Sequence, residues 1–126
     1  IIFPVHPRTE TKVSKFKNLY KNIRFIKPLD YQNFIKVMKE SKFVISDSGG
    51  VQEECAILKK PLIIPRKFTE RPEMLNKFNI LVKNNTQLRR EVKKIQEGTS
   101  KVTNLENLDL IYGKDEVVKK IVNFLN

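Results

Sequence analysis

The 126-residue sequence contains no tryptophan and a single cysteine, Cys55. One cysteine cannot close an internal disulfide and cannot supply the ligands of a structural zinc site, so both devices that stabilise small secreted domains are excluded. No apolar run approaches the ~20 residues that a membrane-spanning helix requires, and the mean hydropathy is −0.41. We therefore expect a globular cytoplasmic domain with its own hydrophobic core, without a metal ion and without a membrane partner.

Acidic residues are few, because 14 Asp and Glu stand against 25 Lys and Arg, which gives a formal net charge of +11. Such a surplus suggests a nucleic-acid partner. The basic residues are spread along the chain with acidic residues between them, however, and no ribbon of alternating basic and aromatic residues is present. A spread surplus is typical of a solvated surface, so we expect no nucleic-acid partner. A basic nucleic-acid-binding domain stays an alternative.

Short apolar runs alternate with segments of helical period. The runs lie at residues 1–5, 23–26, 43–45, 62–64 and 80–82, and their β-branched, non-alternating composition is typical of strands that are covered on both faces. The alternation predicts an α/β protein with a doubly wound parallel, Rossmann-like sheet. Apolar stripes at helical spacing fall between and after the runs: Val13, Phe16 and Tyr20; Tyr31, Phe34, Ile35 and Met38; Val51, Cys55 and Leu58; Leu88, Val92 and Ile95.

The domain boundary is expected near residue 98. Residues 1–97 would form the Rossmann-like domain, and segment 98–113 has sparse apolar residues without a clean period, which indicates a loop. A last helix is expected from Asp115, and part of its apolar face would pack on the same domain or on a domain outside this sequence. Because residue 1 lies in an apolar run with no methionine before it, we expect the N-terminus to belong to a longer protein. The apolar face consists of Val117, Val118, Ile121, Val122 and Leu125.

The tripeptide Ser48-Gly49-Gly50 separates the third predicted strand from a predicted helix. In an open parallel sheet, ligands bind beyond the carboxyl ends of the strands. Two glycines let the backbone approach a ligand, and the first N–H groups of the helix form an anion site. The pattern thus indicates phosphate binding, and the alternative is a tight turn in which Ser48 caps the helix.

Glu53 and Glu54 fall in the first turn of that helix, where the helix dipole favours carboxylates whatever their function. Neighbouring helical residues point about 100° apart. One of the two carboxylates can therefore face the crevice and accept hydrogen bonds from sugar hydroxyls. The helix geometry leaves open which of the two does so.

Segment 69–73, Thr-Glu-Arg-Pro-Glu, predicts a helix start with Thr69 as its cap. A cation in the first turn opposes the helix dipole, so Arg71 calls for an explanation. A diphosphate at the neighbouring glycine turn would supply one, and a surface ion pair with Glu70 or Glu73 would supply another.

His6 and Cys55 are the remaining candidates for chemistry. His6 follows the first predicted strand between Pro4 and Pro7, which hold it stiffly at the strand end. A lone histidine is more often satisfied by local hydrogen bonds than used as a ligand or a base. Cys55 shares an apolar helix face and is predicted to lie in the core.

Segments 46–54 and 69–73, in this order, resemble the C-terminal half of non-hydrolysing UDP-N-acetylglucosamine 2-epimerases. Residues 6–9 and 28–31, with Phe34, are also similar to the family, and the resemblance covers residues 1–83 well. It implies the second Rossmann-like domain of a two-domain GT-B-type fold that holds UDP. Such isomerases eliminate UDP to give a 2-acetamidoglucal and re-add it with inversion at carbon 2, without a nicotinamide or metal cofactor. Their products feed the synthesis of cell-surface polysaccharide precursors.

The resemblance also implies individual roles. Ser48, Gly49 and Gly50 would hold the diphosphate, and Arg71 would neutralise it. Glu54 would bind the ribose hydroxyls, and Glu53 would point away.

Three further residues carry implied roles in the family resemblance. The backbone near Leu29, together with Phe34, would border the uracil. His6 matches a histidine near the interdomain cleft, which in bacterial members is linked to a second, regulatory UDP-sugar.

The sequence departs from the family pattern at several positions. Lys67 and Phe68 stand where the family usually has Asp and Asn or Thr, and Lys59 replaces a common glycine. Segment 111–115 is an eroded form of the usual Pro-Tyr-Gly-Asp-Gly. The changes at Lys67 and Phe68 lie beside Arg71 and leave the substrate choice open.

The resemblance also implies that a large part of the catalytic site is missing. The acidic residues that transfer protons in the family lie in its N-terminal domain, so we expect the isolated chain to bind a UDP-sugar without catalysing the reaction. Its expected partners are the UDP-sugar, the missing N-terminal Rossmann domain or a companion chain, and a second copy in a homodimer. A GT-B glycosyltransferase-like protein and a non-catalytic nucleotide-binding module would have the same fold and bind phosphate in the same way. Both stay alternatives.

Overall fold

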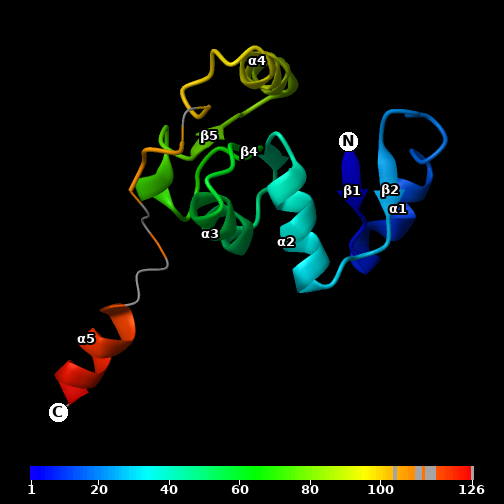
Figure 1. Cartoon of the computed structure of the whole chain (residues 1–126). Coiled ribbons are helices and arrows are strands. Elements are labelled where there is room, and N and C mark those ends of the chain that lie inside the picture. The colour runs from blue at the N-terminus through cyan, green and yellow to red at the C-terminus, as the bar shows by residue number, and fades with distance from the viewer. Residues whose placement is uncertain (104, 110–111, 113–115, 126) are drawn as a thin grey trace. The chain divides into compact units, whose positions relative to one another are not determined.

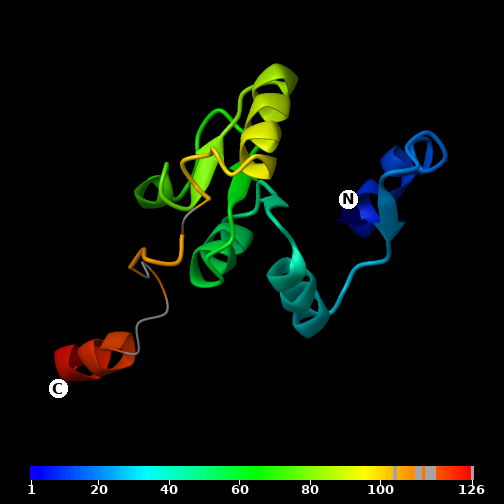
Figure 2. The same cartoon turned by 45° about the horizontal axis from the view of Figure 1, so that its top comes forward.

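The computed structural model describes residues 1–103, 105–109, 112 and 116–125. The chain divides into two compact units, Ile1–Val37 and Met38–Asn126, and Figures 1 and 2 show the elements of each. No helix of the described residues is long and apolar enough to cross a membrane.

The first unit contains a two-stranded parallel sheet. Strand β1 (Ile2–Pro4) pairs with β2 (Arg24–Ile26), and the one-turn helix η1 (Pro7–Thr9) and α1 (Glu10–Ser14) lie between them in the sequence. Helix α2 (Tyr31–Glu40) follows, as predicted, and crosses from the first unit into the second.

Asp30 caps the start of α2. Its Oδ1 accepts a hydrogen bond from Asn33 N at 2.9 Å, and its Oδ2 accepts one from Asn33 Nδ2 at 2.7 Å. Both bonds favour the ionised carboxylate, so they hold the pKa of Asp30 below its ordinary value. This cap fixes the chain direction just after Leu29.

The helical stripe predicted from Val13 to Tyr20 is wrong beyond its first turn, because α1 ends at Ser14. The chain continues in tight turns, in which Phe16 N donates to Val13 O at 2.8 Å. Phe16 and Tyr20 are exposed and contact each other through their rings. A stripe with one apolar residue per turn buries too little surface to hold a helix that short.

The second unit is built on a three-stranded parallel sheet in the order β3 (Val44–Ile45), β4 (Leu62–Ile64), β5 (Asn79–Leu81). Helices α3 (Gly49–Ile57) and α4 (Asn85–Gln96) lie on opposite sides of β4 and β5 in both views (Figures 1 and 2). A one-turn helix, η2 (Pro72–Met74), precedes β5. Parallel strands alternating with helices confirm the predicted α/β class, although the strands are hydrogen-bonded in two sheets, β1–β2 and β3–β4–β5.

The core of the second unit surrounds β4, in which all three side chains are fully buried. Cys55 is also fully buried, as predicted, and its burial raises the pKa of the thiol to about 12. Val102 and Leu105 join this core. Part of the segment predicted as a loop therefore packs on the same unit as β4, while the domain boundary expected near residue 98 stays a prediction.

Helix α5 (Glu116–Leu125) ends the described chain. The five apolar residues of its predicted stripe are all exposed, from 49% for Val122 to 77% for Leu125. Asp115, the predicted first residue of this helix, lies outside the described residues, as do positions 111, 113 and 114 of the eroded family motif. What this face packs on stays a prediction.

Candidate functional site

The candidate site lies at the carboxyl edge of the three-stranded sheet. Strands β3 and β4 are parallel and end at Ile45 and Ile64. The loop after β3 carries Ser48, and the loop after β4 carries Arg71. The structure thus brings both predicted motifs to one edge, where a doubly wound sheet binds its ligands.

Ser48 and the two glycines start α3, as predicted. Ser48 makes no side-chain capping bond, and its carbonyl accepts from Gln52 N at 3.1 Å. Ser48 therefore occupies the N-cap position, as in the alternative, but its hydroxyl does not cap the helix. A methyl group added at Gly49 would lie 3.3 Å from Glu70 Oε2, whereas one at Gly50 would have no heavy atom within 4 Å. Gly49 is thus the crowded position and Gly50 the open one.

Arg71 is held by Glu53 of α3. Its Nε donates to Glu53 Oε1 at 2.8 Å, and its Nη2 lies 2.6 Å from the same oxygen. The hydrogen bond that Arg71 donates to Glu53 raises the pKa of Arg71 further above its ordinary value. The ion pair that was the alternative explanation for Arg71 therefore exists, but its partner is Glu53 rather than Glu70 or Glu73. The expectation that Glu53 points away is wrong.

The helix predicted to start at Thr69 is shorter and begins later. Only η2 forms, with Arg71 at its N-cap position and Pro72 as its first residue. The Thr69 hydroxyl accepts from Arg71 N at 3.0 Å and donates to Gln52 Oε1 at 2.5 Å. Thr69 therefore caps a turn of the loop rather than an α-helix.

The sequence reasoning missed Gln52, which is 1% exposed. A signal for it was present, because Gln52 stands three and four residues before the buried Cys55 and Ala56 and so shares their helix face. A polar side chain on a buried face needs a hydrogen-bond partner. Thr69 supplies that partner.

A second arginine, Arg66, was also missed. Its Nη2 lies 3.2 Å from Asp47 Oδ2, and its Nη1 lies 3.7 Å from Glu70 Oε1. Asp47 follows β3 and Arg66 follows β4, so the two meet because these strands pair. The carboxyl edge therefore holds two arginines, each fixed by carboxylates.

Tyr112 extends the site from far along the sequence. It packs against the core of the second unit, and its hydroxyl donates to Glu73 Oε1. That bond lowers the pKa of Glu73, and desolvation, with the same bond, raises the pKa of Tyr112 to about 12. One residue of the eroded motif is thus placed beside the loop that carries Arg71.

The remaining predicted residues lie in the first unit or along α3. His6 is exposed, and its Nδ1 accepts from Arg8 N at 3.2 Å, which caps η1. Leu29 and Phe34 are half-buried in the first unit, and Glu54 is half-buried in α3. The local hydrogen bond of His6 agrees with the alternative in which this histidine is satisfied by local hydrogen bonds and is neither a ligand nor a base. The ligand roles of these four residues stay predictions.

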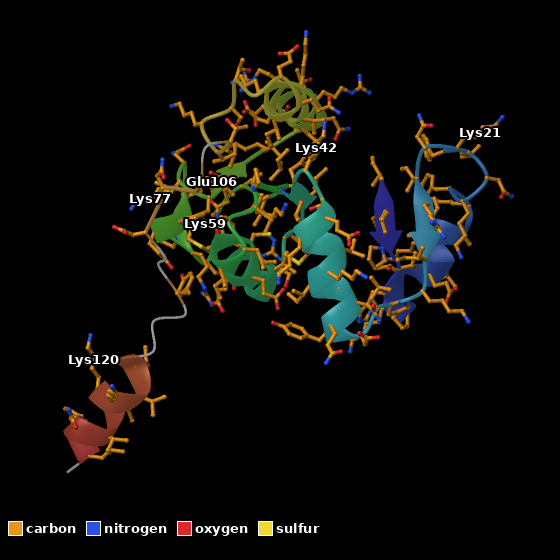
Figure 3. The ribbon with its side chains drawn as sticks, viewed as in Figure 1. Lys21, Lys42, Lys59, Lys77, Glu106 and Lys120 are labelled. Atoms are coloured by element: carbon orange, nitrogen blue, oxygen red, sulfur yellow. The ribbon has the colours of Figure 1, made fainter. Side chains whose placement is uncertain are left out.

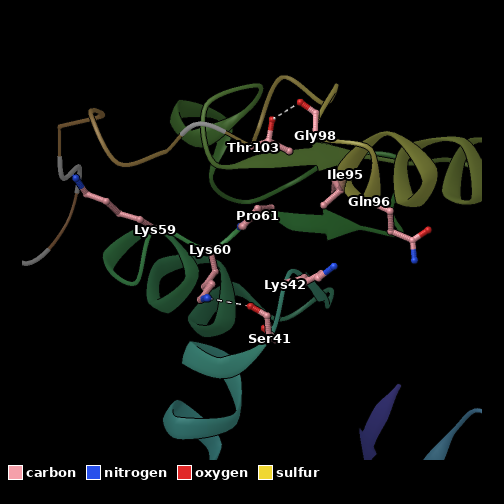
Figure 4. A pocket seen from close by; sticks show the side chains of 9 residues that line it. All are labelled: Ser41, Lys42, Lys59, Lys60, Pro61, Ile95, Gln96, Gly98 and Thr103. Carbon is pink, nitrogen blue, oxygen red and sulfur yellow. Dashed lines mark hydrogen bonds between the residues drawn. The ribbon is translucent and has the colours of Figure 1, made fainter.

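The opposite, amino edge of the same sheet has a hollow of about 480 Å³ that is also basic (Figure 4). Lys42, Lys59 and Lys60 line it, but their side chains point in different directions. Lys60 Nζ donates to Ser41 O at 2.9 Å, and Lys59 Nζ donates to the carbonyl of Glu106 (Figure 3). Lys59 has a φ of 53°, the left-handed conformation that glycine favours, in keeping with a position where the family commonly has glycine.

Metal binding finds no support in the side chains that the structure describes. No group of three or more His, Cys, Asp or Glu residues among them could hold a metal ion. The candidate site offers instead two arginines and a helix N-terminus, which are groups that bind anions.

Comparison with known proteins assigns the family. The family model described as UDP-N-acetylglucosamine 2-epimerase matches residues 1–126. The UDP-N-acetylglucosamine 2-epimerase of Methanocaldococcus jannaschii is 37% identical over 99% of this chain and 34% of its own length. The chain thus spans about a third of that relative.

Solved structures agree in fold. The M. jannaschii UDP-GlcNAc 2-epimerase in complex with UDP-GlcNAc and UDP superposes with a TM-score of 0.76 at 36% identity, over 99% of this chain and 35% of that one. The Neisseria meningitidis UDP-GlcNAc 2-epimerase bound to UDP-GlcNAc superposes with a TM-score of 0.77 at 30% identity, over 98% and 35%. These likenesses confirm the predicted Rossmann-like, GT-B-type fold class. With a family model that matches its whole length, the chain belongs to the UDP-N-acetylglucosamine 2-epimerase family.

Proposed function

We propose that this chain binds the UDP part of a UDP-sugar at the carboxyl edge of its three-stranded sheet, as the nucleotide-binding portion of a UDP-N-acetylglucosamine 2-epimerase. The observation that carries the proposal is the Arg71 guanidinium, fixed by Glu53 beside the N-terminus of α3. The diphosphate would lie against Ser48, Gly49 and Gly50, where the helix dipole and backbone N–H groups favour negative charge. Arg71 would neutralise it.

The hydrogen bonds of Arg71 leave capacity for such a ligand. A guanidinium carries five N–H donors. Its Nε and Nη2 contact Glu53, and its Nη1 donates to Glu70 O at 3.1 Å. Both terminal nitrogens carry a second N–H. A side chain that is already oriented loses less conformational freedom when the ligand arrives, which favours binding.

The other roles in this proposal rest on the family resemblance. Glu54 would accept hydrogen bonds from the ribose hydroxyls, and the uracil would lie near the Leu29 backbone and Phe34. His6 would contact a second, regulatory UDP-sugar. We place the protein in the cytoplasm, where its product would feed cell-surface polysaccharide synthesis.

The reaction has two chemical requirements, and this chain offers suitable groups for only one of them. Eliminating UDP requires a base for the proton at carbon 2 and an environment that stabilises the departing diphosphate. Ser48, Gly50 and Arg71 suit the second requirement. For the first, Glu53 is engaged with Arg71 and Glu54 is assigned to the ribose. We therefore assign the proton transfers to a part of the enzyme beyond these residues, an N-terminal Rossmann domain or a companion chain.

Calorimetric titration of the chain with UDP tests the proposal. Arg71→Ala removes a charge-assisted contact and should weaken UDP binding roughly ten- to a hundredfold. Arg89→Ala, at an exposed position of α4, is the matched control and should bind as the unaltered chain does. Equal affinities for all three proteins would overturn the site. In deuterated water the chain should give no exchange at carbon 2 of UDP-N-acetylglucosamine above the protein-free rate.

A further inference from the structure

We propose that Thr69 is a positioning residue for Arg71, which links the buried amide of Gln52 to the backbone of the loop after β4. The proposal deepens the function proposed above and rests on it. It concerns a residue that does not touch the ligand and acts through the arginine that does.

The link consists of two consecutive hydrogen bonds. Gln52 Oε1 accepts from Thr69 Oγ1 at 2.5 Å, and Thr69 Oγ1 accepts from Arg71 N at 3.0 Å. A hydroxyl can donate one bond while it accepts another. Gln52 is 1% exposed, so its side chain is fixed within the fold and gives the loop a rigid point of attachment.

Glu53, the next residue of α3, holds the other end of Arg71. It contacts Nε at 2.8 Å and Nη2 at 2.6 Å. Adjacent helical residues point about 100° apart, so Gln52 and Glu53 reach two different points of the loop. Arg71 is therefore tied to α3 through its backbone, by way of Thr69, and through its guanidinium.

This double attachment fixes the guanidinium relative to the helix N-terminus that would bind the diphosphate. Pro72 restricts the backbone of Arg71 from the other side, because a residue before proline is held away from helical geometry. With only Glu53, the guanidinium would have its counter-ion, but the backbone of Arg71 would not be fixed. Thr69 fixes this backbone. The placement of a binding group within a fraction of an ångström governs how well it binds a ligand.

The test compares Thr69→Val with Thr69→Ser in UDP titrations. Valine has the shape of threonine without the hydroxyl and loses both bonds, whereas serine keeps both. We expect Thr69→Val to weaken UDP binding about three- to tenfold and Thr69→Ser to restore binding to the level of the unaltered chain. Thermal unfolding of each variant is recorded in parallel.

A double-mutant cycle separates positioning from general structural damage. In an Arg71→Ala background, Thr69→Val should weaken UDP binding no further, because the residue through which it acts is gone. Damage to the fold would instead weaken binding by the same factor in both backgrounds, and that result would overturn the proposal. If Thr69→Val does not fold, Thr69→Ala replaces it in the cycle, since this half-exposed position tolerates a smaller side chain.

The outcomes also distinguish the two proposals. If Arg71→Ala weakens UDP binding and Thr69→Val does not, the positioning role is wrong and the binding site stands. If the unaltered chain binds no UDP, or Arg71→Ala binds as well as it does, the proposed function is wrong and the positioning role falls with it.

Discussion

The two edges of the three-stranded sheet carry similar charges and arrange them differently. At the carboxyl edge, Arg66 and Arg71 are each fixed by a carboxylate from a neighbouring element. At the amino edge, Lys42, Lys59 and Lys60 line a hollow of about 480 Å³, but their side chains point in different directions. The difference teaches that a surplus of cations does not define an anion site. Its position at a helix N-terminus, with guanidinium groups held beside it by carboxylates, does.

The ion pairs at the carboxyl edge matter for geometry more than for stability. The side chain of Arg66 is 40% exposed and those of its partners are 60% and 64% exposed. Exposed pairs of this kind stabilise a fold very little, because water and salt screen them. Their effect is to hold guanidinium groups in place at one edge before a ligand arrives. At the opposite edge, Lys59 and Lys60 donate to separate backbone carbonyls, and the lysine side chains diverge.

The largest expected effect comes from reversing one charge at each edge. Arg66→Glu would place a third carboxylate beside Asp47 and Glu70, and we expect it to weaken UDP binding by roughly tenfold or more. Lys60→Glu, at the amino edge, should change UDP affinity by less than about twofold, since Lys60 lies at the opposite end of the strands and salt screens distant charges. Calorimetry with UDP measures both. Equal losses from the two reversals would mean that overall charge, and not the carboxyl edge, attracts the nucleotide.

The sequence was sufficient for features that depend on neighbouring residues. The apolar run at Leu62–Ile64 forms a fully buried strand, and Cys55 lies in the core. The glycine turn after β3 starts a helix, as expected. Each of these follows from local composition and period, which persist in the fold whatever packs on them.

The contacts that build the site could not be predicted in the same way. Glu53 and Arg71 are 18 residues apart, and Glu73 and Tyr112 are 39 apart. Their meeting depends on which strands pair and on how the loops leave them. The predicted helix at 69–73 failed for a related reason, because hydrogen bonds to Gln52 and Glu53 of another element hold that segment in a loop.

A second prediction uses the reactivity of Cys55 to report on α3, the helix that begins at the carboxyl edge and contains this cysteine. Cys55 is fully buried, and its thiol has a pKa of about 12, so at pH 8 a thiol reagent reacts only after the region opens. UDP bound at the start of α3 should slow labelling by a factor of 1 + [UDP]/Kd, roughly elevenfold at ten times Kd. In the Lys60→Glu variant the protection should be unchanged. Labelling that UDP does not slow would place the nucleotide elsewhere.

The same thiol makes stability depend on pH in a defined direction. The folded pKa of Cys55, about 12, lies above its ordinary value of 9.0, so the folded state holds its proton more tightly than the unfolded state does. This contribution is complete below pH 9 and is lost as the pH rises toward 12. Denaturant titrations of Cys55→Ser against the unaltered chain, across that interval, would show whether the slope belongs to this group.

A fourth prediction contrasts the two glycines of the carboxyl edge. Gly49→Ala would set a methyl group 3.3 Å from Glu70 Oε2, where the diphosphate is expected to approach, and should weaken UDP binding about three- to tenfold. Gly50→Ala has open space around its methyl group and keeps its N–H. It should weaken UDP binding less than Gly49→Ala does and stabilise the fold by up to ~1 kcal/mol, because alanine restricts the unfolded chain. The reverse ranking in calorimetry would show that Gly50, not Gly49, faces the ligand.

The smallest expected effect concerns Glu70, which places a negative charge at the very edge proposed for an anion. Its Oε2 is the heavy atom nearest to a methyl group at Gly49, and its Oε1 lies 3.7 Å from Arg66 Nη1. Glu70→Gln removes repulsion toward the diphosphate and also weakens the pair with Arg66. The first effect should prevail, because the pair with Arg66 is long and exposed and contributes little.

We therefore expect Glu70→Gln to strengthen UDP binding about two- to threefold at low salt. The gain should disappear in high salt, since screening removes the repulsion that the substitution relieves. Glu97→Gln is the matched control, because Glu97 follows α4 and neighbours Gln96 and Gly98, which line the hollow at the amino edge. It should leave UDP affinity unchanged at every salt concentration. A loss of affinity in Glu70→Gln would mean that the carboxylate orients Arg66 for the ligand, so that even the acidic groups of the carboxyl edge contribute to binding through the arginines they hold.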